Sequence, residues 1–69
     1  MENEKEIYRF IIFCLEHYRN FRQITAMQAF SLFRKTGVFQ YLTEGYDVLH
    51  TQSRDYIVTD IDDFITHHT

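Results

Sequence analysis

The chain has 69 residues, carries seven Lys and Arg against ten Asp and Glu, and is 45% apolar, with seven Phe and five Tyr. This length allows one domain, predicted over residues 1–69, and the apolar content excludes a disordered tail. Cys14 is the only cysteine, which excludes an intrachain disulfide, and the longest apolar run, Phe10–Leu15, is far shorter than the ~20 residues that cross a bilayer. An unpaired cysteine fits a reducing compartment, and the chain starts with acidic rather than basic residues, so we expect no secretory signal, no membrane contact and a cytoplasmic location.

The first predicted helix covers about residues 4–22. Tyr8, Ile12 and Leu15 form one apolar stripe along it. A second stripe consists of Ile7, Phe10, Ile11, Cys14, Tyr18 and Phe21. A helix that is apolar nearly all round is usually buried on more than one side. This helix is therefore the predicted centre of the fold. Because so short a chain has few elements to cover both sides, part of its apolar surface is expected to remain exposed.

The second predicted helix covers about residues 25–36. Thr25 followed three residues later by Gln28 has the spacing of a capping box, in which each side chain bonds the other residue's backbone. Gly37 is suited to the left-handed conformation that ends many helices. The predicted buried face consists of Met27, Phe30 and Phe33, supported by Ala26 and Ala29.

A third helix is predicted over about residues 38–50, and a fourth over about 60–67. Gly45 lies inside the third, where glycine marks a close helix approach or a bend. Residues 51–55 are polar and predicted as a loop. Residues 56–58 are β-prone, so a short extended segment is an alternative prediction there. Thr59 is a candidate N-cap for the last helix. The prediction is an all-α, compact bundle of four short helices.

The sequence offers little support for catalysis or metal binding. Cys14 and His17 share a helix face, but no further ligand follows at the spacing of a zinc site. Cys14 also lies among apolar residues, where a thiol is neutral and unreactive. We therefore predict no catalytic, metal or cofactor-binding residues and a chain that is not an enzyme.

A protein partner is the leading functional expectation, because a core this small is marginally stable and oligomerisation is a common remedy. Tyrosine is enriched at protein interfaces, and a partner would bury the apolar surface of the first helix that the fold leaves exposed. The candidate partner surface consists of Tyr8, Ile12, Leu15, Tyr46, His50, Tyr56, Asp60 and Asp62. The partner is either a second copy or a different protein, and the sequence leaves both open.

A small nucleic-acid-binding regulator is the alternative function. Its candidate basic patch consists of Arg19, Arg22, Arg34 and Lys35. The net charge of −3 disfavours nucleic acid as a partner, because phosphate binding usually requires a basic surface.

The sequence resembles a family of short bacterial proteins known only as a domain of unknown function. The resemblance runs through three groups: the FxxxCxExY pattern at residues 10–18, the LFxKxGV pattern at 32–38, and LHT followed by YIVxDID at 49–62. Members of this family are often encoded beside an ADP-ribosyltransferase-like protein. The resemblance therefore implies a small, non-enzymatic, antitoxin-like or immunity-like partner of a co-encoded enzyme.

Overall fold

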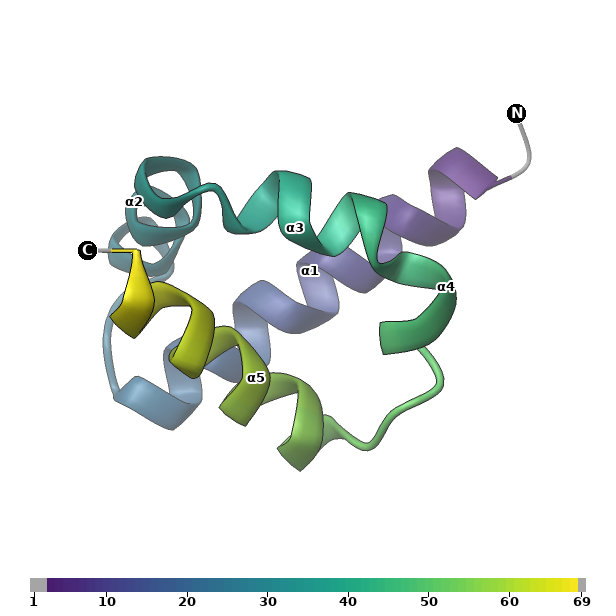
Figure 1. Ribbon diagram of the computed structural model, residues 1–69. Helices are drawn as coiled ribbons and strands as arrows, with labels where there is room; N and C mark the ends of the chain where they lie inside the picture. Colours follow the sequence, from purple (N-terminus) through teal and green to yellow (C-terminus); the bar gives the residue numbers. More distant parts are fainter. Residues whose placement is uncertain (1–2, 69) are drawn as a thin grey trace.

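The computed structural model describes residues 3–68, which form five α-helices around one apolar core (Figure 1). The helices are α1 (Asn3–Arg22), α2 (Ala26–Thr36), α3 (Val38–Glu44), α4 (Tyr46–Leu49) and α5 (Arg54–His67). No strand occurs among residues 3–68, so the predicted all-α class is confirmed for this part of the chain. The predicted number of four helices is wrong.

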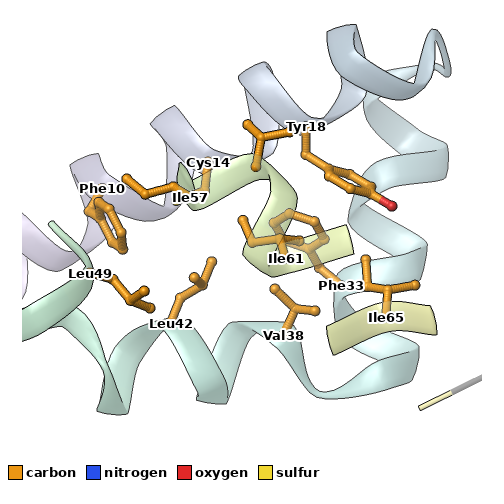
Figure 2. Packing of buried hydrophobic residues seen from close by; sticks show 11 residues of the cluster. Phe10, Cys14, Tyr18, Phe33, Val38, Leu42, Leu49, Ile57, Ile61 and Ile65 are labelled. Carbon is orange, nitrogen blue, oxygen red and sulfur yellow. The ribbon is translucent and has the colours of Figure 1, made fainter. Parts of the chain in front are cut away.

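Helix α1 sets the length of the molecule. Its 20 residues contain neither Gly nor Pro, and at 1.5 Å per residue they span about 30 Å, which matches the 31 Å long axis of the molecule. Phe10, Cys14 and Tyr18 lie one helical turn apart and face inward with exposures of 8, 0 and 0%. Figure 2 shows them in a row opposite Leu42 and Val38 of α3. One stripe of α1 therefore builds the core.

Beyond Tyr18 the packing of α1 loosens. Phe21 was expected on the buried stripe, but it is 53% exposed. It lies in the last turn of α1, just before the chain changes direction at Gln23, whose φ is 56°. Because the chain leaves the helix axis here, no neighbouring helix covers the Phe21 ring completely.

Helix α2 has the predicted ends but only part of the predicted face. The capping box of Thr25 and Gln28 is present, with hydrogen bonds of 2.9 and 3.0 Å, and Gly37 ends the helix at φ 87°. The expected burial of Met27 and Phe30 is wrong, because they are 80 and 48% exposed. The buried residues of α2 are Ala29, Phe33 and Thr36. These three residues share one helical face, and Met27 lies on the opposite side of α2.

The predicted helix over residues 38–50 divides into α3 and α4 at Gly45. A Cβ atom at Gly45 would lie 3.0 Å from Leu49 Cδ1 and 3.2 Å from the Tyr41 carbonyl oxygen. Of the two predicted reasons for glycine, the bend is confirmed, whereas the atoms that a Cβ would meet belong to residues four positions away rather than to a helix packed across Gly45. The bend brings Leu49 into the core at 7% exposure.

Helix α5 begins well before the position that the sequence suggested. Ser53 rather than Thr59 is the N-cap, because the Tyr56 amide donates to Ser53 Oγ at 3.1 Å. The extended segment at 56–58 is therefore wrong, and Asp60 and Asp62 lie inside the helix rather than in its first turn. The buried residues of α5 are Ile57, Val58, Ile61 and Ile65. They share one helical face, and burial of this face outweighs the weak strand preference of the β-branched residues.

The core is a single cluster to which all five helices contribute. Its members are Phe10, Cys14, Tyr18, Phe33, Val38, Leu42, Leu49, Ile57, Val58, Ile61 and Ile65. In Figure 2 Ile61 of α5 lies between the row from α1 and the row from α3, and Ile57 lies beside Cys14. Within residues 3–68 no helix combines the length and the apolar character that a membrane span requires.

Candidate functional site

The predicted partner surface is spread over three places in the fold. Tyr8, Ile12 and Leu15 lie on α1, Tyr46 on α4 with His50 as its C-cap, and Tyr56, Asp60 and Asp62 on α5. On α1, Tyr8 and Ile12 are 64 and 65% exposed and point away from the inward stripe, whereas Leu15 is half-buried against the core. Tyr8 and Ile12 are therefore the members of the α1 group that are most open to a partner.

Tyr46 and His50 form a local aromatic pair at the end of α4. Their rings stack at 4.4 Å with an interplanar angle of 10°, and His50 Nδ1 lies 2.6 Å from the Tyr46 carbonyl oxygen. The Tyr46 ring also packs edge-on against Phe10 of α1 at 5.5 Å. These contacts fix both side chains beside the N-terminal half of α1, on a different side from Tyr8 and Ile12.

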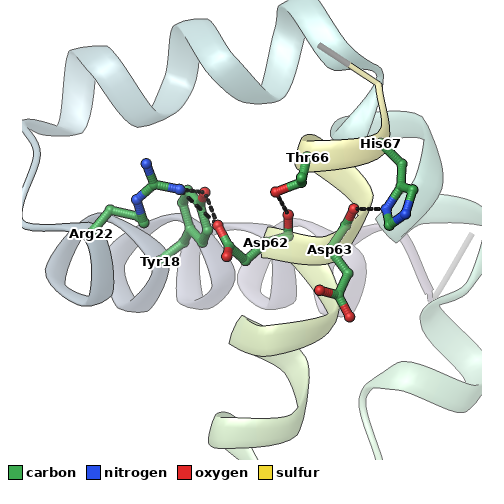
Figure 3. Close-up of polar contacts among 6 residues, drawn as sticks. All are labelled: Tyr18, Arg22, Asp62, Asp63, Thr66 and His67. Atoms are coloured by element: carbon green, nitrogen blue, oxygen red, sulfur yellow. Dashed lines mark hydrogen bonds and ion pairs between the residues drawn. The ribbon is translucent and has the colours of Figure 1, made fainter.

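Asp62 joins α5 to the end of α1 (Figure 3). The Tyr18 hydroxyl donates to Asp62 Oδ1 at 2.9 Å, and Arg22 Nη1 donates to the same oxygen at 2.8 Å and to the Tyr18 oxygen at 3.2 Å. Burial, reinforced by Asp62, raises the pKa of Tyr18 to about 12, and the hydrogen bond to Asp62 raises the pKa of Arg22 above its usual value. Asp62 therefore has partners within its own chain.

Asp60 makes the corresponding contact to α3. The Tyr41 hydroxyl donates to Asp60 Oδ2 at 2.6 Å, and this bond, together with burial, raises the pKa of Tyr41 to about 12. The Tyr41 ring stacks on Phe64 at 4.3 Å. Tyr56, four residues before Asp60, is 53% exposed on the outer side of α5. Of the three α5 candidates, Tyr56 is thus the one that remains mostly open.

The four residues of the candidate basic patch do not converge. Arg22 forms an ion pair with Asp62, and Arg19 Nη1 lies 3.7 Å from Glu16 Oε2. Arg34 and Lys35 are exposed in the last turn of α2, whereas α1 ends at the opposite end of that helix. A groove that follows a phosphate backbone needs cations along one continuous surface. The structure therefore places the two pairs of cations apart, and Arg19 and Arg22 each have an acidic partner.

Two neighbouring hollows line the contact of α1 with α4 and the start of α5, and together we name them the seam. The larger, about 490 Å³, is lined by His17, Asn20, Phe21, Arg54, Asp55, Val58 and Thr59. The smaller, about 310 Å³, is lined by Glu6, Arg9, Phe10, Phe13, Tyr46, His50, Gln52 and Ile57. The rings of Phe13 and His17, 4.3 Å apart, lie between the two hollows. Tyr46 and His50 are the predicted surface residues that belong to the seam.

The sequence reasoning missed most of the seam. Phe13, His17 and Phe21 repeat every four residues along one side of α1, and this spacing was the available signal. The opposite wall could not be foreseen, because Arg54 and Val58 were assigned to a loop and an extended segment. Only the early start of α5 brings these two residues against α1.

The thiol of Cys14 and the imidazole of His17 lie in different environments. Burial raises the pKa of Cys14 to about 12, and the fully buried thiol is out of reach of a substrate. Across residues 3–68, no three His, Cys, Asp or Glu side chains are grouped so that they could hold a metal ion. His17 and Asp55 line the same hollow. What the seam offers is aromatic surface with charges of both signs at its edge.

Comparison with known proteins gives a family and no function. No curated protein matches the chain, and no solved structure matches it either. The gene neighbourhood implied by the sequence resemblance stays a prediction. A family model described as a protein of unknown function, DUF3791, matches residues 9–68, which is most of the chain. The resemblance to a family of unknown function is confirmed, and the chain belongs to the DUF3791 family.

Proposed function

We propose that the protein is a non-enzymatic interaction module that binds another protein through the seam. The observation that carries the proposal is the pairing of two hollows with partly exposed aromatic rings. Phe21 is 53% and Phe13 39% exposed, and each borders one hollow. Aromatic residues at the edge of a concave surface are typical anchors of protein interfaces.

The polar groups of the seam suit recognition of a peptide or protein surface. Arg9 and Glu6 border the smaller hollow, and Arg54 and Asp55 border the larger one. Exposed aromatic rings flanked by charges of both signs resemble the general anatomy of protein interfaces. The expected partner segment therefore inserts apolar side chains into both hollows and carries charged residues beside them.

The co-encoded enzyme implied by the family resemblance is the partner to test first. In that role the protein is antitoxin-like or immunity-like and acts by covering a surface of the enzyme. The alternative, a nucleic-acid-binding regulator, has less support because Arg19 and Arg22 have acidic partners in their own chain.

The test is co-purification of the tagged chain with the product of the neighbouring gene, followed by a titration of the pair. Phe21→Ser removes an aromatic wall of the seam, and Phe30→Ser on α2 is the matched control, since the two rings are 53 and 48% exposed. We expect Phe21→Ser to weaken binding at least about 10-fold, as for an interface anchor, and Phe30→Ser to bind like the wild type. Equal effects of the two variants, or no binding by the wild type, would contradict the proposal.

A further inference from the structure

We draw no further inference here: the strongest candidate, the hollow of about 470 Å³ on the outer side of α5 where the carboxylates of Asp55, Asp60 and Asp63 meet, is an acidic cluster, and nothing in the described part of the chain shows which ligand or partner covers it.

Discussion

The two sides of α1 have similar composition and opposite environments. Phe10 and Cys14 on the inner side are 8 and 0% exposed, whereas Tyr8 and Ile12 on the outer side are 64 and 65% exposed. Both stripes have helical spacing, so periodicity alone identifies them equally well. The inner stripe is buried because α3, α4 and α5 supply matching apolar side chains opposite it (Figure 2). The comparison shows that one side of a helix can hold a small fold together while the other side stays exposed to solvent.

The largest expected loss of stability comes from a substitution in the core that packs against the inner side of α1. Ile61 of α5 is fully buried in the core cluster that the inner stripe of α1 helps to form. Ile61→Ala leaves a cavity in a core that cannot collapse freely, and we expect a loss of about 2–5 kcal/mol in the free energy of unfolding, measured by urea denaturation. This loss is comparable to the whole stability of a chain of this size. A loss below about 1 kcal/mol would show that the core is looser than the structure indicates.

The next effect is a loss of stability in alkali. Burial raises the pKa of Cys14 from 9.0 to about 12, and the pKa values of Tyr18 and Tyr41 are raised from 10.0 to about 12. The folded chain therefore keeps protons that the unfolded chain releases. Stability is complete below pH 9 and is lost as the pH rises toward 12, at about 1.4 kcal/mol per pH unit for the Cys14 thiol.

Unfolding curves recorded between pH 7 and 11 give this dependence, and a thiol reagent provides the control. The native thiol should react at the rate at which the chain unfolds. Reaction at the rate of a free cysteine in folded protein would contradict the burial of Cys14.

A smaller loss of stability is expected when either of the two carboxylates that connect α5 to its neighbours, Asp62 or Asp60, is removed. Asp62→Ala leaves the hydroxyl of buried Tyr18 without its acceptor and Arg22 without its counter-ion, and we expect it to cost about 1–3 kcal/mol. Asp60→Ala deprives only the half-buried Tyr41 of a partner and should cost about 0.5–1.5 kcal/mol. Thermal unfolding of both variants under identical conditions gives the order. The reverse order would mean that the contact of Asp60 with α3 stabilises the position of α5 more than the contacts of Asp62 with α1.

The smallest effect is expected on the outer side of α1. Ile12→Ala makes the same chemical change as Ile61→Ala, but at a residue that is 65% exposed. We expect a change within about 0.5 kcal/mol in the free energy of unfolding. A loss of 2 kcal/mol or more would place Ile12 in the core and remove the contrast between the two sides.

The elements that the sequence predicted well have strong local signals. The capping box at Thr25 and the left-handed Gly37 depend on a few neighbouring residues and are both confirmed. The bend at Gly45 was likewise predicted. Each of these features depends on residues that are close together in the sequence.

The features that were missed depend on tertiary packing. Residues 56–58 have strand propensity, yet Ile57 and Val58 complete a buried helical face with Ile61. The ion pair of Arg22 with Asp62 joins residues that the sequence placed on separate candidate surfaces. The seam was missed for the same reason, since its second wall exists only because α5 begins at Arg54.

The most direct test of the seam as a binding surface is a titration of the product of the neighbouring gene with the wild type, Phe21→Ser and Phe30→Ser. Phe21 and Phe30 are 53 and 48% exposed, but of the two only Phe21 lines a hollow of the seam. The account predicts that Phe21→Ser weakens binding at least about 10-fold and that Phe30→Ser binds like the wild type. Equal affinities of the two variants would contradict it.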